Sequence, residues 1–140
     1  MSVLSTLPPA AVLPLEGLDA RALRAEAAAS GQRWLQADCA GATTKAEVMA
    51  ALASGLRLPA YFGGNLDALY DCLTDLKPRR GAAAPGLVLL LEGLPQGDGF
   101  DASQHEALME VLRDAADDFA GRGIGFRVFY ALSAARPASP

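Results

Sequence analysis

Apolar residues recur three and four positions apart along much of the chain, which is the spacing of helices with one buried face. This pattern predicts helices over residues 17–30, 45–56, 66–76 and 101–119. The first three of these helices begin at or near residues that cap a first turn well, namely Asp19, Thr44 and Asn65. Thr44 and Glu47 also have the spacing of a capping box.

Three shorter apolar runs lie outside these helices and predict strands over residues 33–39, 87–91 and 126–132. The run 87–91 is aliphatic throughout, which is typical of a strand that is covered on both faces. Because strands alternate with helices, we expect right-handed crossovers and a parallel sheet. The predicted fold is therefore α/β, with three parallel strands in sequence order packed with helices. An extra N-terminal helix is added to it, and the pattern does not indicate where that helix packs.

The length of 140 residues fits one domain, which the pattern divides into three parts. Residues 1–30 are expected to be an N-terminal extension with one helix, 31–133 the main domain, and 134–140 a frayed tail. Within the extension, residues 1–14 contain three prolines and are interpreted as a loose leader. Neither a signal peptide nor a membrane-spanning stretch is apparent, so a cytoplasmic location is expected.

Charge and composition narrow the choice of partners. The formal net charge of −4 disfavours nucleic acid as a ligand and favours a basic protein. Arg79 and Arg80 are interpreted as a solvated connector, because no aromatic stacking partner accompanies them. The two cysteines, Cys39 and Cys72, are too few for a disulfide scaffold and are expected to be buried thiols in a reducing compartment.

The helix predicted over 66–76 carries an unusual set of charges. Asp67, Asp71 and Asp75 are spaced four residues apart, which places three carboxylates on one side of the helix. Neighbouring like charges destabilise a helix slightly, so folding alone does not favour this arrangement. Tyr61 and Phe62 in the preceding loop would complete a contact surface for a basic partner. The spacing alone does not establish a function, because a stripe of carboxylates is usually just a solvated helix face and two aromatic residues can simply seal the core.

The same region carries a long ordered motif. Residues 58–74 read LPAYFGGNLDALYDCLT and follow, without a gap, the pattern L-P-x-Y-[FY]-G-x-N-L-D-A-L-[WY]-D-C-L-T. This pattern resembles the signature of the barstar family, bacterial intracellular inhibitors of barnase-type ribonucleases. The resemblance continues through the predicted strands and helices after residue 31, and the first thirty residues lie outside it. It implies a barstar-like fold over 31–133 and an inhibitor, not an enzyme, with no cofactor and no metal.

In that family, an acidic helix and the loop before it plug the active site of the ribonuclease. The inhibitor thereby protects the cell that makes the enzyme. The resemblance gives Asp71 the position of the central carboxylate and Asp67 that of the acid one turn earlier. Asp114 matches a contacting glutamate, and Tyr61 matches a tyrosine that packs on the catalytic histidine of the enzyme. The other contact residues implied by the resemblance are Phe62, Gly63, Asn65, Leu66, Tyr70 and Val111.

Some positions depart from the family pattern. Tyr70 and Leu76 stand where the family has tryptophans, Gly64 replaces a charged residue, and Phe62 lacks the hydroxyl group of a tyrosine. Carboxylates such as Asp67 and Asp71 can imitate substrate phosphates in a basic cleft, and these departures leave them in place. The changes therefore bear on which ribonuclease is bound.

The expected partner is a small basic ribonuclease of the barnase type, with no nucleic acid and no membrane contact, and the free chain is expected to be a monomer. A barstar-like module that regulates another basic protein is the alternative. An enzyme that uses Asp67, Asp71 and Asp114 as acid–base groups or metal ligands is a third class. No nucleophile, phosphate loop or histidine partner accompanies those residues, and His105 is interpreted as a structural surface residue.

Overall fold

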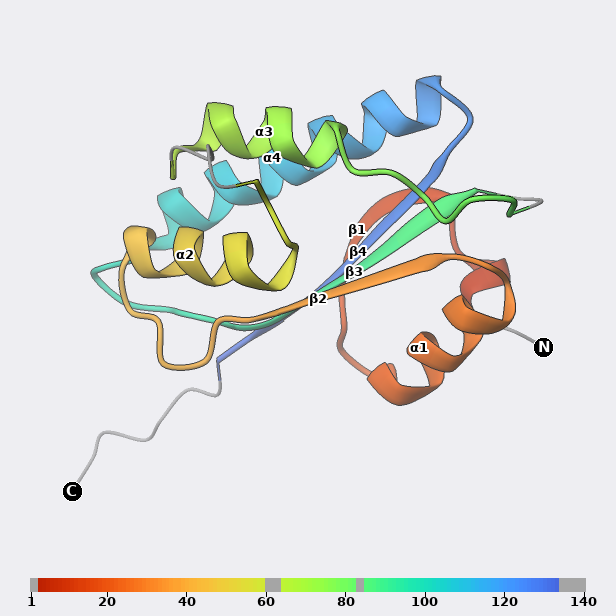
Figure 1. The fold of residues 1–140 in the computed structure, drawn as a ribbon. Coiled ribbons are helices and arrows are strands. Elements are labelled where there is room, and N and C mark those ends of the chain that lie inside the picture. Colours follow the sequence, from red (N-terminus) through yellow and green to blue (C-terminus); the bar gives the residue numbers. More distant parts are fainter. Residues whose placement is uncertain (1–2, 60–63, 83–84, 134–140) are drawn as a thin grey trace.

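The computed structural model describes residues 3–59, 64–82 and 85–133 (Figure 1). A short 3₁₀ turn, η1 (Leu4–Thr6), opens the described chain. The helices are α1 (Ala20–Ala29), α2 (Lys45–Gly55), α3 (Leu66–Thr74) and α4 (Ala102–Gly121). The strands are β1 (Ala10–Pro14), β2 (Arg33–Asp38), β3 (Gly86–Leu94) and β4 (Gly125–Leu132).

The sheet has four strands, all parallel, in the order β1-β4-β3-β2. The prediction of α/β architecture is confirmed, and the three predicted strands lie side by side in sequence order. The prediction of only three strands is wrong, because residues 10–14 of the supposed loose leader pair with β4. Pro14 ends β1, and Pro9 precedes it and accepts a hydrogen bond from Phe126 N at 2.7 Å. Prolines at the ends of an edge strand do not interrupt its ladder.

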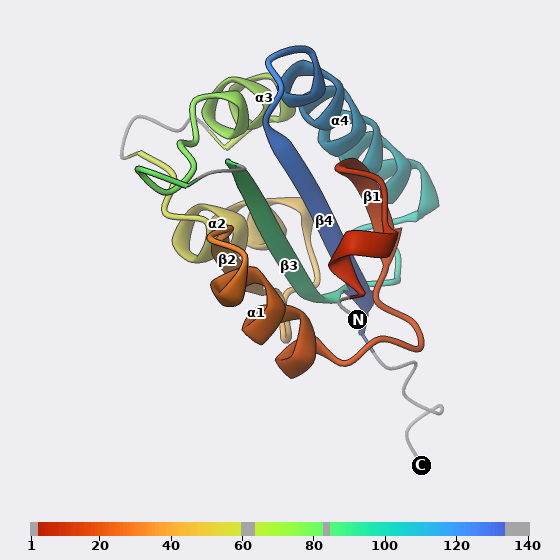
Figure 2. The ribbon, with the colours of Figure 1, turned by 90° about the vertical axis from the view of Figure 1, so that its right-hand side faces the viewer.

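Helices cover both faces of this sheet (Figure 2). On one face, α2, α3 and α4 enclose the larger core, which includes Leu87, Leu89 and Leu91 of β3. On the other face, α1 packs with Leu23 and Ala27 against a smaller cluster that includes Val88, Leu90 and Phe129. Alternate residues of β3 therefore enter different cores, as its aliphatic sequence predicted. The packing site of α1, which the sequence left open, is this second face.

The predicted caps are confirmed and set the helix starts. Asp19 accepts a hydrogen bond from Arg21 N at 3.0 Å, and Asn65 accepts one from Ala68 N at 2.8 Å. Thr44 and Glu47 form the expected capping box. None of the helices in the described ranges is both long and apolar enough to span a membrane.

One strand is longer than its pattern predicted. The strand predicted over 87–91 continues as β3 to Leu94, through an irregularity in register between Leu91 and Leu94. Gly93 has φ +71°, a conformation that glycine adopts without strain, and Ser133 N donates to Leu94 O at 2.8 Å. A glycine inside a strand marks a bulge here, not an end.

Both cysteines are free and buried, as expected. Burial, with a smaller effect from Asp38, raises the pKa of Cys39 to about 11, and burial also raises the pKa of Cys72.

His105 is half-buried, which corrects its assignment to the surface. Its ring lies edge-on to Phe100 and Tyr130, and this burial lowers its pKa.

The capping box of α2 gives the first testable prediction. Hydrogen bonds from Thr43 and Thr44 lower the pKa of Glu47 below its usual 4.5. A lowered pKa in the folded state means that the charged form contributes stability above pH 4.5 and loses it as the pH falls through the folded value. Glu47→Gln keeps the box, as Gln104 does in α4, but removes the charge. We expect the variant to be slightly less stable at neutral pH.

The measurement is urea denaturation of both proteins at neutral pH and at a series of values below 4.5. The gap between their free energies of unfolding should close as the solution becomes acidic. A gap that stays constant across the series would mean that the charge of Glu47 contributes nothing.

Candidate functional site

An open groove of about 710 Å³ runs between α3 and α4. The lining residues from α3 are Leu66, Asp67, Tyr70 and Asp71. Those from α4 are Val111, Asp114, Asp117 and Asp118. The groove thus joins a half-buried floor of leucine, tyrosine and valine to walls that contain five aspartates.

The sequence of α3 orients its side of the groove. Leu69 and Leu73 are completely buried in the core below, which turns Asp67 and Asp71 outward, where both are exposed. Asn65 fixes the start of the helix by its cap, so Asp67 lies in the first turn. A carboxylate in that position is favoured by the helix dipole.

The sequence of α4 orients the opposite side of the groove in the same way. Leu112 and Phe119 are buried in the core, while Asp114 and Asp117 are exposed and Asp118 is half-buried. Asp117 and Asp118 lie three and four residues after Asp114, which places all three on one side of the helix. Both helices therefore present acids on the face that their buried leucines leave free.

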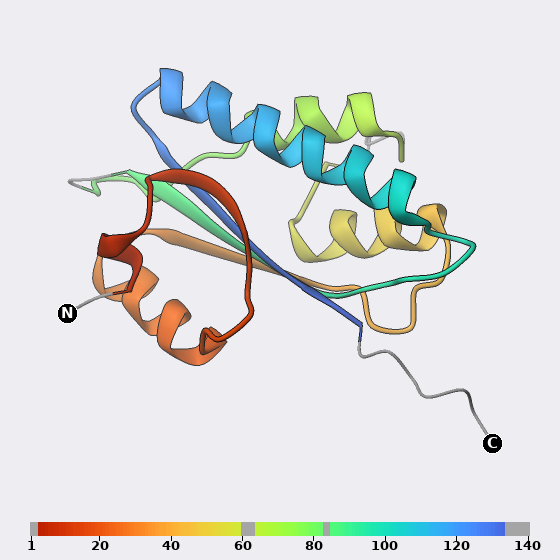
Figure 3. The same cartoon turned by 180° about the vertical axis from the view of Figure 1, so that it is seen from behind.

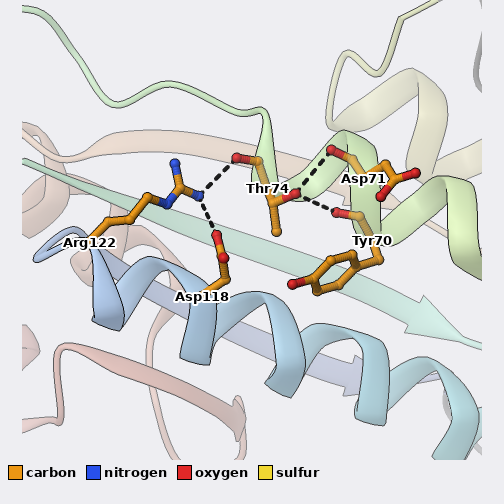
Figure 4. Close-up of polar contacts among 5 residues, drawn as sticks. All are labelled: Tyr70, Asp71, Thr74, Asp118 and Arg122. Atoms are coloured by element: carbon orange, nitrogen blue, oxygen red, sulfur yellow. Dashed lines mark hydrogen bonds and ion pairs between the residues drawn. The ribbon is translucent and has the colours of Figure 1, made fainter.

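A bridge of hydrogen bonds ties the two helices together at one end of the groove (Figure 4). Arg122 donates to Asp118 Oδ2 at 2.7 Å and to the carbonyl oxygen of Thr74 at 2.9 Å. Thr74 Oγ1 in turn donates to the carbonyl oxygens of Tyr70 and Asp71. The guanidinium group of Arg122 also lies 4.3 Å from the centre of the Phe119 ring. This bridge holds the C-terminal end of α3 against α4.

The charge of the groove is largely uncompensated. Within the described part of the chain, Asp118 is the one groove aspartate that forms an ion pair. Exposed carboxylates gathered in one concavity attract basic partners and speed their association. In residues 3–59, 64–82 and 85–133, no group of three or more His, Cys, Asp or Glu side chains is arranged to hold a metal ion.

A comparison with family models identifies the region that carries this groove. The model described as Barstar (barnase inhibitor) matches residues 32–131, well over half of the chain. The chain belongs to the barstar family. The resemblance seen in the motif at 58–74 is thereby confirmed. A search of curated proteins gave no match.

The barstar match spans β2 to β4 almost completely and leaves out β1 and α1. Because β1 extends the barstar sheet and α1 covers its second face, the N-terminal addition shares the hydrophobic core with the family domain. The barstar family is a family of inhibitors, in agreement with the expectation that the chain is not an enzyme.

Most of the residues implied by the barstar motif gather in the groove: Leu66, Asp67, Tyr70, Asp71, Val111 and Asp114. Asn65 lies beside it as the helix cap. Tyr61, Phe62 and Gly63 lie outside the described residues. Asp75, the last acid of the predicted stripe, is exposed beyond the end of α3 and does not line the groove.

Two groove residues, Asp117 and Asp118, were not among those implied by the barstar motif. Their spacing from Asp114 placed them on one face of the last helix. The resemblance already grouped Val111 and Asp114 of this helix with the acids of α3. No local pattern shows that Asp117 and Asp118 join them, since the contact depends on the packing of two helices that are distant in the chain.

Proposed function

We propose that this barstar-family protein binds a small basic ribonuclease of the barnase type and occludes its active site. The observation that carries the proposal is the groove between α3 and α4, where exposed carboxylates from two helices face one opening. The proposed contact residues of the groove are Leu66, Asp67, Tyr70, Asp71, Val111 and Asp114. Those of the adjoining loop are Tyr61, Phe62, Gly63 and Asn65.

The mechanism is mimicry of the substrate by charge. The active site of a ribonuclease is a basic cleft that accepts phosphate groups. Asp67 and Asp71, held on a capped helix, offer carboxylate oxygens as acceptors for the arginine, lysine and histidine groups of such a cleft. The Arg122 bridge keeps α3 in place before binding, and less conformational freedom is then lost on association.

The N-terminal addition leaves the groove accessible. α1 packs on the sheet face opposite to α3 and α4, as the view from behind also shows (Figure 3). Both Asp67 and Asp71 are exposed in the presence of α1 and β1. A protein inhibitor of this kind would act in the cytoplasm, where it protects the cell that produces the ribonuclease.

The test is an activity assay with a purified barnase-type ribonuclease and the full chain. We expect activity to fall in proportion to added chain until the two are equimolar, and the association rate to fall as salt is raised. An enzyme that stays active with the chain in excess would contradict the proposal.

The replacement of a family tryptophan by Tyr70 in the groove favours a second candidate function. Tyr70 is half-buried and lines the groove, so this change alters the surface that a partner meets. A regulatory module for another basic protein would use the same acids. Size-exclusion chromatography of the chain with the ribonuclease, combined with the activity assay, distinguishes the two functions. A complex of the two proteins that leaves ribonuclease activity unchanged supports the second function.

A further inference from the structure

A second cavity, of about 560 Å³, has the opposite charge. It lies where α1, the start of β2 and the connector after α3 meet. The residues that matter for its chemistry are Arg24, Arg33, Trp34, Lys77, Arg79 and Arg80. Figure 1 shows this connector running to the end of the sheet at which β2 begins.

Five cationic side chains surround this cavity in a chain whose net charge is −4. Arg24, Lys77, Arg79 and Arg80 are exposed. Among the residues that the structure describes, none of the five cations forms an ion pair with a carboxylate. Folding therefore does not account for their gathering, whereas clustered unpaired cations are the basis of phosphate binding.

The geometry of the cavity is fixed by one of its own cations. Arg33, the first residue of β2, donates through Nη1 to the carbonyl oxygen of Lys77 at 2.9 Å. This bond attaches the connector to the start of the strand across a long separation in sequence. It holds Lys77, and with it Arg79 and Arg80, beside the exposed Arg24 of α1.

An aromatic ring completes the cavity. Trp34 is half-buried, packs against the cluster beneath α1 and also lines the cavity. Its indole Nε1 donates to Gln36 Oε1 at 3.2 Å, which restrains the orientation of the ring. Arg79 and Arg80 were interpreted as a plain connector because no aromatic residue is near them in sequence. The fold supplies that residue from β2.

We propose that this basic cavity binds single-stranded nucleic acid, with phosphates on the arginine and lysine groups and a base against Trp34. Cations that follow a backbone and an aromatic ring that accepts a base are the two elements of such sites. The inference goes beyond ribonuclease inhibition, since the cavity and the acidic groove share no residue. It departs from the expectation of no nucleic acid contact, which rested on the net charge of the whole chain and not on the separate charges of the two cavities.

Trp34 is the only tryptophan of the chain, so its fluorescence reports on this cavity alone. The experiment is a titration of the full chain with a single-stranded oligouridylate at low salt, with no ribonuclease present. We expect quenching of Trp34 and binding that weakens as salt rises. If all five cations contact phosphates, the slope of log affinity against log salt approaches about −3.5.

The variant Arg79→Ala/Arg80→Ala removes two exposed cations and should make that slope shallower by about 1.4. The matched control is Lys45→Ala/Arg113→Ala, which removes the same charge elsewhere and should leave the slope unchanged. Trp34→Leu, measured with a labelled oligonucleotide, should weaken binding on the order of tenfold through the loss of stacking. Circular dichroism and thermal unfolding check that each variant is folded.

Three results would overturn the proposal. They are absence of binding at low salt, equal binding by the Arg79→Ala/Arg80→Ala variant, and oligonucleotide binding that leaves Trp34 fluorescence unchanged. Inorganic polyphosphate and anionic lipid vesicles are tested alongside. Equal affinity for either of them would contradict the assignment to nucleic acid and would show a general anion site instead. Because no nuclease takes part, these outcomes are independent of whether the chain inhibits one.

Discussion

Replacing Asp71 by alanine is expected to weaken binding to a barnase-type ribonuclease more than any other single change in the groove, because the barstar resemblance gives Asp71 the position of the central carboxylate. Asp71 lies on the exposed side of α3 and lines the groove, where a partner would cover it. Truncating one member of a buried charge pair costs about 2–5 kcal/mol, or roughly thirtyfold to several thousandfold in Kd. The range of energies includes values for barnase–barstar charge pairs. It is therefore taken from the barstar family and is not obtained from the geometry of this groove.

The measurement for Asp71→Ala is the inhibition constant of each variant against the same ribonuclease. Asp75→Ala is the matched control, because Asp75 is an exposed aspartate at the end of the same helix that does not line the groove. It should inhibit almost as well as the natural chain. Equal inhibition by both variants would remove the groove from the binding site.

Replacing Leu23 by alanine is expected to destabilise the whole protein, although Leu23 belongs to the N-terminal addition. Its side chain is 1 % exposed and packs in the cluster that contains Val88, Leu90 and Phe129. Truncation of a buried leucine costs about 2–5 kcal/mol in free energy of unfolding. Denaturation in urea measures this loss, and a single transition would show that the addition unfolds together with the barstar-family region.

The control for Leu23→Ala is Arg21→Ala, an exposed position of the same helix, where the change in stability should stay within about 0.5 kcal/mol. Ribonuclease inhibition by folded Leu23→Ala should be unchanged, because α1 and the groove lie on opposite faces of the sheet. A separate early transition that leaves the rest folded would instead support the division of the chain at residue 31.

Local signals predicted one wall of the candidate site. The cap at Asn65, the leucines of the following helix and the spacing of Asp67 and Asp71 were enough to turn both acids outward. The opposite wall was beyond these signals. Asp117 and Asp118 enter the groove because α4 packs beside α3, and such tertiary packing leaves no local pattern in the sequence.

The fold was predicted best where an element has its own cap and buried stripe, as in α2. It was predicted worst in β1, whose short run of small and aliphatic residues lies between Pro9 and Pro14. The strand exists because β4 offers a partner for it, with Ala10 beside Phe126 and Leu13 beside Phe129. Pairing of this kind overrides weak local preference. Trp34 and Arg79 are likewise distant in the sequence, and only the folded chain brings them to the same basic cavity.

The order of strands also has a consequence for self-association. The most apolar strand, β3, lies in the interior of the sheet, between β4 and β2. The two free edges are β1, which is short and ends in Pro14, and β2, which exposes Gln36 and Asp38. Short, proline-ended or charged edges are poor templates for the addition of a further strand. The aliphatic segment most prone to form intermolecular β-structure is thus shielded by neighbours that resist aggregation.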